Sequence, residues 1–301
     1  MVPSAISCLY TPEILSRLAS VQRTASPRED AAADSVRHRH IIFSGEELTG
    51  HALRVRRAAW WGYLEHAAAV GLLDEEDLRQ RLVDVDDDNF RGAFAECLVS
   101  WYFANRLGVE LRRYGGDGAR HADFEGPGDL HVEVKAPYAP VPGPAWSGDD
   151  AAVLRQCIQH AGGQFKKNMV NVVVVVPLLR TPVWMQPGQL VKATIGEWAM
   201  AVHVSLDPAV PAPPPTPRFL QRGKLAQLHE GGTRTHLTRV SAVVCIEEET
   251  MLGKEGVVLR HYVHVVHNPF VAKPLPSAVF GDRRQLVVGE EGMSWVGQAG
   301  G

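Results

Sequence analysis

The stretch HADFEGPGDLHVEVK, residues 121–135, decides the fold that we expect for this chain. Its second half, 130–135, alternates apolar and polar residues, which is typical of a strand with one face in a core. Glu133 and Lys135 therefore share the face opposite the apolar one. The Gly126–Asp129 segment is a strong turn signal, so 121–124 and 130–135 are expected to form two strands joined by a tight turn.

This arrangement suggests a metal site. Asp123 lies before the turn and can return close to Glu133. Two carboxylates and a main-chain carbonyl provide the hard oxygen ligands that Mg²⁺ prefers. Lys135 beside the ion would orient or deprotonate an attacking water, or offset charge on a phosphate. Asp129 or Glu125 remains an alternative to Asp123.

The elements around this stretch indicate an α/β fold. A patterned helix over Asn89–Leu107 ends at Gly108, and the acidic run before it suits the positive end of a helix. Val172–Val176 does not alternate and is expected to be a strand buried on both faces, parallel to Leu130–Lys135. The remaining expected elements are a strand over 109–114 and a helix from Asp149 to about Lys167.

The order of these residues resembles the PD-(D/E)xK nuclease superfamily, which has the restriction-endonuclease-like fold. Its signature is an Asp, a short hairpin and then Glu-x-Lys, here Asp123 and Glu133–Lys135. The family often adds a Glu in the preceding helix, here Glu96, and a Gln or Lys in the following helix, here Gln164. The resemblance covers roughly residues 89–177 and implies a mixed central sheet flanked by helices.

The resemblance also implies roles and a function. Asp123, Glu133 and Glu96 would hold Mg²⁺, for which Mn²⁺ would substitute, while Lys135 assists the water and Gln164 positions the site. The function implied is a Mg²⁺-dependent endonuclease that hydrolyses phosphodiester bonds in DNA, in restriction or phage defence, as a homodimer or within a larger defence complex. The alternatives are a non-catalytic nucleic-acid-binding or assembly subunit on the same fold, and a nuclease acting on RNA.

Purely structural interpretations of the same residues remain open. Glu133 and Lys135 could form a salt-bridge ladder on an exposed edge strand, and Asp123 could serve the turn alone. Glu96 could pair with Arg91 or Arg106. Gln164 could be a simple helix-end residue, and its rivals for the positioning role are Gln156, Gln159, Lys166 and Lys167.

The rest of the chain is expected to add to this core. A loosely packed arm (1–43, with a short helix over 12–21) and a helical extension (44–88) precede it. Residues 178–288 complete the domain with a helix that includes Leu190, Ile195, Trp198 and Val202, then a Pro-rich loop and an antiparallel strand pair at the sheet edge. That pair is expected over 238–247 and 257–266, followed by a mobile tail over 289–301.

The amino-acid composition bears on the partners and the cellular compartment of the protein. The net charge of −3 gives no overall electrostatic signature for nucleic acid, so a nucleic-acid partner would have to meet a local basic patch, and the Lys166–Lys167 pair flanks the expected site. Four well-separated cysteines indicate a reducing compartment rather than a disulfide framework. With neither a secretory signal nor an apolar stretch of membrane-spanning length, we expect a cytoplasmic protein that does not contact membranes.

Overall fold

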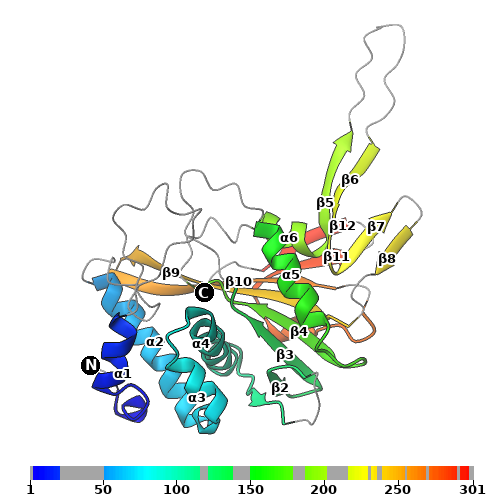
Figure 1. Cartoon of the computed structure of the whole chain (residues 1–301). Helices are drawn as coiled ribbons and strands as arrows, with labels where there is room; N and C mark the ends of the chain where they lie inside the picture. The colour runs from blue at the N-terminus through cyan, green and yellow to red at the C-terminus, as the bar shows by residue number, and fades with distance from the viewer. Residues whose placement is uncertain are drawn as a thin grey trace, which may run out of the picture.

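The computed structural model describes residues 3–20, 51–115, 121–137, 150–178, 187–201, 216–229, 232–235, 239–254, 256–268, 271–289 and 292–297. In this part of the chain, an eight-stranded mixed sheet with the order β1-β2-β3-β4-β9-β10-β11-β12 has helices on both faces (Figure 1). The predicted α/β class with a mixed, helix-flanked sheet is confirmed.

The strands of this sheet are β1 (Arg112–Arg113), β2 (Phe124–Gly126), β3 (Leu130–Lys135), β4 (Val170–Val175), β9 (Ala242–Gly253), β10 (Gly256–His267), β11 (Arg284–Gly289) and β12 (Gly292–Val296). Two separate hairpins are β5 (Gly196–Ala201) with β6 (Thr216–Arg222), and β7 (Ala226–His229) with β8 (Gly232–Thr235). The helices are α1 (Pro12–Ser20), α2 (His51–Ala69), α3 (Glu76–Leu82), α4 (Asp87–Tyr102), α5 (Asp150–Gly162) and α6 (Pro187–Thr194). Short turns of helix are η1 (Ser4–Ile6), η3 (Leu72–Asp74), the π-helical η4 (Phe103–Leu107) and η6 (Ser277–Val279).

The centre of the sheet is the parallel trio β3, β4 and β9, in which Glu133 lies level with Val173 and Val173 with Val243. The predicted parallel pairing of β3 with β4 is confirmed. β4 is buried on both faces, as its continuous apolar sequence indicated. The antiparallel hairpin of β2 and β3 pairs Gly126 with Leu130, and its turn places Gly128 and Asp129 at φ values of 68° and 61°. Glycine takes this left-handed conformation without steric cost.

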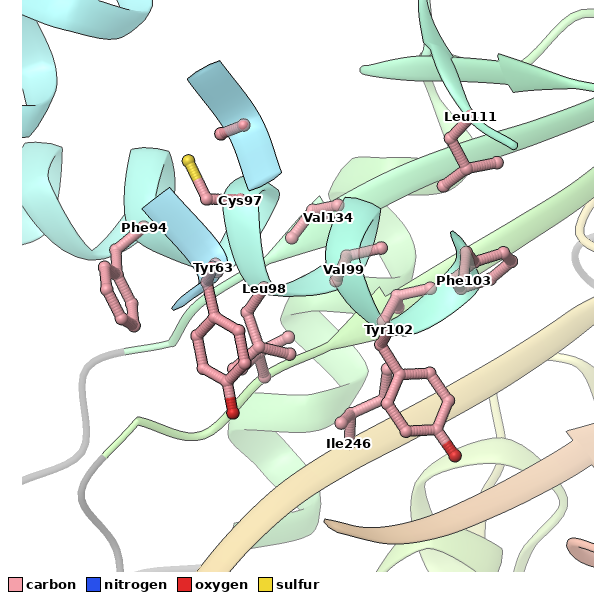
Figure 2. Packing of buried hydrophobic residues seen from close by; sticks show 14 of the residues in the cluster. Tyr63, Phe94, Cys97, Leu98, Val99, Tyr102, Phe103, Leu111, Val134 and Ile246 are labelled. Atoms are coloured by element: carbon pink, nitrogen blue, oxygen red, sulfur yellow. The ribbon is translucent and has the colours of Figure 1, made fainter. Parts of the chain in front are cut away.

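Two apolar clusters cover the two faces of the sheet. On one face, α1 to α4 pack against the strand residues that include Val132, Val134 and Ile246. Figure 2 shows side chains of α4, among them Leu98 and Tyr102, lying against the strands that carry Val134 and Ile246. On the other face, α5 and α6 pack against a second cluster. Because both faces are covered, a polar residue on a central strand is removed from water wherever it points.

The helix before the β2–β3 hairpin begins at Asp87, two residues earlier than predicted, and its helical turns end at Leu107, as predicted. Asp86 is its N-cap and accepts a hydrogen bond from the Asp88 main-chain N–H at 2.8 Å. Gly108 ends the π-helical turn that continues it, with φ 66°. The acidic run is therefore helix-start chemistry, as predicted.

The prediction that the last long strand pair lies at the sheet edge is wrong. β9 and β10 do pair antiparallel, but β9 also pairs in parallel with β4, which places it at the centre of the sheet. Residues 242–246 are apolar at every position and buried on both faces. β11 and β12 then extend the sheet beyond β10.

The predicted helix through Ile195 and Trp198 is also wrong beyond Thr194, where α6 ends. Gly196 has φ 115°, which interrupts the helix, and the chain continues as β5, in which Trp198 pairs with Phe219. Val202 lies outside the described residues.

Both ends of the chain are more ordered than predicted. The predicted helix at 12–21 is present as α1, and Ile6, Tyr10 and Leu18 belong to the main core, so residues 3–20 are not a loose arm. Gly292–Val296 form β12 rather than a mobile tail.

A buried polar cluster fastens α2 to the sheet. Tyr63 Oη donates to Oε1 of Glu248 at 2.5 Å and lies 2.8 Å from Nε2 of His261, while Trp60 Nε1 donates to Oε2 of Glu248 at 3.1 Å. His261 is thus part of the polar contact that holds α2 on the sheet. None of the helices among the described residues is both long and apolar enough to cross a membrane.

One central carboxyl group gives the fold a testable pH dependence. Glu247 on β9 is 4% exposed, and its burial, with the nearby Glu249 charge, raises its pKa from 4.5 to about 8. Between these values the folded protein holds a proton that the unfolded chain has released. The unfolding free energy should therefore fall as the pH rises through this range, by at most about 1.4 kcal/mol per pH unit.

We expect Glu247→Gln to reduce this slope, measured by urea unfolding at about pH 5, 6.5 and 8, while the raised pKa values of Glu133 and Glu96 maintain the remainder. The control Glu110→Gln alters an exposed residue and should leave the slope intact. Equal slopes in Glu247→Gln and the wild type would contradict the assignment.

Candidate active site

Glu133 and Lys135 lie side by side on the face of β3 that α5 covers. Glu133 is 2% exposed, and Lys135 Nζ donates to its Oε1 at 2.5 Å. Val132 and Val134, which alternate with them along the strand, face the opposite apolar cluster, as the alternation predicted. Because β3 lies between β2 and β4, the salt-bridge ladder on an exposed edge strand is excluded.

Asp123 reaches the same strand from the other arm of the hairpin. It comes immediately before β2, and its Oδ2 accepts a hydrogen bond from the main-chain N–H of Val134 at 2.7 Å. This bond places the carboxylate between the positions of Glu133 and Lys135 along the chain. The predicted approach of Asp123 to β3 is thus seen in the structure.

The two rivals of Asp123 lie elsewhere on the hairpin. Asp129 is in the turn at the far end, where Oδ2 pairs with Lys273 Nζ at 2.9 Å. Glu125 is exposed and lies opposite His131 rather than Glu133. Neither shares the Val134 contact of Asp123, so Asp123 is the carboxylate that the structure brings beside Glu133.

Gln164 is the residue after α5 that meets the site. With its amide oriented by hydrogen bonding, its side-chain nitrogen donates to both carboxylate oxygens of Glu133, at 2.7 Å for Oε2. The backbone N–H of Gln164 donates to the Ala161 carbonyl at 2.9 Å, which continues the end of the helix. Among the rivals named from sequence, Gln159 instead accepts from Lys224, and Lys166 donates to Tyr114.

Glu96 on α4 is 5% exposed and is held by two arginines. Arg81 donates from Nη1 to its Oε1 at 2.9 Å, and Arg113 Nη1 lies 2.7 Å from its Oε2. Arg113 also donates to Glu75 at 2.9 Å, and its Nη1 lies 4.0 Å from Oδ1 of Asp123. The pairing with Arg91 or Arg106 that we considered is therefore replaced by pairing with Arg81 and Arg113.

The three carboxylates influence one another. Burial is the main cause of the raised pKa of Glu133, and the Asp123 and Glu96 charges add to it while Lys135 opposes it. Burial and the Asp123 charge likewise raise the pKa of Glu96, against the opposing effect of Arg113 and Arg81. Three carboxylates are therefore crowded into a region with little solvent, where Lys135, Arg81 and Arg113 offset their charge.

The described residues do not assemble a complete metal centre. Among them no group of three His, Cys, Asp or Glu side chains is arranged to hold an ion together. Because arginines bind the Glu96 carboxylate, the ligand set Asp123, Glu133 and Glu96 is not assembled. Asp123 and Glu133 do suit a hard cation, because two carboxylates lie side by side there and the Asp123 charge adds to the raised pKa of Glu133.

Sequence reasoning did not find Arg81 and Arg113. A glutamate on the apolar side of a helix signals a cationic partner, because an unpaired buried charge is costly. The partner's identity depends on α3 and β1, which meet α4 only in the folded chain.

Breaking this cluster should be measurable. Arg113→Met removes one of the two cations on a buried carboxylate, and we expect it to lower the unfolding free energy by on the order of 2 kcal/mol or more. In a double-mutant cycle, Glu96→Gln should recover part of this loss because the uncompensated charge disappears. The control Arg79→Met breaks an exposed ion pair with Glu76 and should cost less than about 1 kcal/mol. Additive losses in the cycle would contradict the pairing.

Comparison with protein-family models, with curated proteins and with solved structures finds no match for this chain. The resemblance to the PD-(D/E)xK superfamily therefore rests on the residues themselves. What supports it is one cluster in which Asp123, Glu133, Lys135 and Gln164 lie together. Glu96 is connected to this cluster through Arg113, which lies near Asp123.

Proposed function

We propose that this chain is a metal-dependent nuclease that hydrolyses phosphodiester bonds, in DNA, with restriction or phage defence as its setting. The observation that carries the proposal is the contact of Lys135 and Gln164 with Glu133 beside Asp123 on a buried strand. Burying a carboxylate beside a half-buried ammonium group on one strand is costly, and a stable fold gains more from apolar residues there. Such a cost is typical of a catalytic centre.

Each residue has a chemical role in this proposal. Asp123 and Glu133, with a main-chain carbonyl of β3, would hold Mg²⁺ or Mn²⁺, which supplies a polarised water and charge neutralisation at the phosphate. Lys135 orients the water or stabilises the phosphate charge, and its ion pair with Glu133 keeps it in place. Gln164 fixes the Glu133 carboxylate.

Glu96 acts at one remove in this proposal. It holds Arg113, and Arg113 lies near both Asp123 and Glu75. The positive guanidinium group of Arg113 therefore reduces the electrostatic repulsion between the Glu96 and Asp123 carboxylates. We assign Glu96 and Arg113 as positioning residues.

Loss of the lysine should abolish cleavage. Lys135→Met retains most of the side-chain volume without the charge, and we expect it to lower the cleavage rate by on the order of 100-fold or more. The measurement is cleavage of plasmid, linear single-stranded DNA and RNA with Mg²⁺, with Mn²⁺ and with EDTA. The control Lys254→Met makes the same change at an exposed residue that follows β9 and should leave the rate unchanged. Unaltered cleavage by Lys135→Met would contradict the assignment of Lys135 as a catalytic residue.

Metal binding should depend on one aspartate of the hairpin and not on the other. Calorimetry should detect Mn²⁺ binding to the wild type and its loss in Asp123→Asn, because the variant lacks one ligand charge. The matched control is Asp129→Asn, which alters the carboxylate at the turn and should keep full affinity. Loss of binding in Asp129→Asn alone would transfer the metal site to Asp129.

A specific observation favours the alternative of a non-catalytic nucleic-acid-binding or assembly subunit. Both oxygens of Glu133 already accept hydrogen bonds from within the protein, from Lys135 and Gln164. A carboxylate with a purely structural role is satisfied by these hydrogen bonds and requires no metal ion. Absence of Mn²⁺ binding by the wild type, together with retained nucleic-acid binding, would select this alternative.

A further inference from the structure

A group of rings lies on the Glu133 face of β3, toward the start of the strand. His131 is two residues before Glu133, about 6.6 Å along an extended strand. Its ring is edge-on to Tyr114, with centroids 5.2 Å apart. On Tyr114 the ring of His121 is stacked, at 5.8 Å and an interplanar angle of 21°. His121 is exposed and Tyr114 half-buried, so this ring cluster reaches solvent.

A cation lies at the hydroxyl edge of the Tyr114 ring. Lys166 Nζ donates to the Tyr114 hydroxyl at 2.5 Å and lies 5.2 Å from its ring centroid. The chain after Lys166 turns at Asn168, which has φ 63°, before it enters β4. This turn brings further basic residues to the same end of the sheet.

Those residues line a cavity of about 180 Å³. That volume holds several water-sized groups. Its walls are Lys167, Asn168, Met169, Arg239, Val271, Ala272 and Lys273. With Lys166 nearby, four cations face the acids at this end of the hairpin, which are Asp129, paired with Lys273, and the exposed Glu125. The local charge is therefore positive, in contrast to the negative chain as a whole.

Buried polar groups hold the basic residues in place. The side-chain amide of Asn171, itself 0% exposed, donates to the main-chain carbonyls of Lys166 and Arg239 at 2.8 and 2.7 Å. Ser241, also buried, donates to the carbonyl of Lys273 at 2.7 Å and accepts from the Asn171 N–H at 3.0 Å. An Asn in a valine strand lowers apolar burial, and here it fixes the backbone of two basic residues, while Ser241 fixes that of the third. The cavity is thus a built feature rather than a chance meeting of surface lysines.

We propose that this region binds single-stranded nucleic acid, with an unpaired base stacked on Tyr114 and His121 and a phosphate of the same strand in the Lys167–Arg239–Lys273 cavity. Aromatic rings take any base by its flat face, but in a duplex that face is covered by the neighbouring base pairs. Basic side chains neutralise the backbone without regard to sequence. That the bound nucleic acid continues toward Glu133 rests on the proposed nuclease function. The binding of single-stranded nucleic acid does not rest on it.

The test measures binding by the full chain in EDTA, so that cleavage plays no part. The probes are fluorescein-labelled dT and rU oligomers and a duplex of mixed sequence, followed by fluorescence anisotropy. We expect the wild type to prefer single strands, and the dT and rU arms to show whether DNA or RNA is taken. Tyr114→Leu should weaken single-strand binding about 10-fold, since base–aromatic stacking contributes that much.

Further variants separate stacking from folding and charge. Tyr114→Phe keeps the ring without the Lys166 bond and should bind nearly as the wild type does, which distinguishes stacking from a folding defect. Lys167→Gln should weaken binding a few-fold and reduce the salt dependence by about one phosphate contact. The control Lys254→Gln should change neither.

The outcomes also separate this inference from the nuclease proposal. Single-strand binding without Mg²⁺-dependent cleavage would leave this inference standing and remove the nuclease. Cleavage with unchanged binding by Tyr114→Leu would do the reverse. Equal affinity for the duplex, or equal competition by polyglutamate, would overturn the inference because binding would then be charge attraction alone.

Discussion

Glu133 lies on a sheet whose two faces are both covered by helices, so its charge has no access to bulk water. An ionised carboxylate is stable in such a place only with partners that donate to it. Lys135 on the same strand and Gln164 after α5 provide them. The chain after α5 brings Gln164 to this group, whereas the Asp123 carboxylate, held by the Val134 N–H, adds a negative charge beside it.

Most of the centre of the molecule could be predicted from sequence because its signals are local. The alternation of Leu130–Lys135, the turn at Gly128 and Asp129, and the continuous valines of β4 each require only neighbouring residues to interpret. Asp123 follows from the same logic, since a short hairpin returns it to β3. Gln164 came from the family pattern, and the structure places it on Glu133.

What sequence could not provide depends on distant partners. β9 carries apolar residues on both faces, yet only its pairing with β4 shows that it lies inside the sheet. Arg81 and Arg113 meet Glu96 from two separate elements, so no spacing along the chain relates them. The end of α6 was missed because Gly196 interrupts a helical apolar pattern that continues through Trp198.

The place of β9 has a consequence for how the protein is made. β4 ends at Val175, and the strand that covers its second edge begins only at Ala242. A chain emerging from the ribosome with its N-terminus first therefore carries an open, strongly apolar strand edge until the later segment docks. Pairings between distant segments form slowly, because a long loop must close first. A fragment that stops after β4 would keep this exposed edge permanently and would aggregate, so the segment that carries Asp123 and Glu133 is completed only when β9 docks.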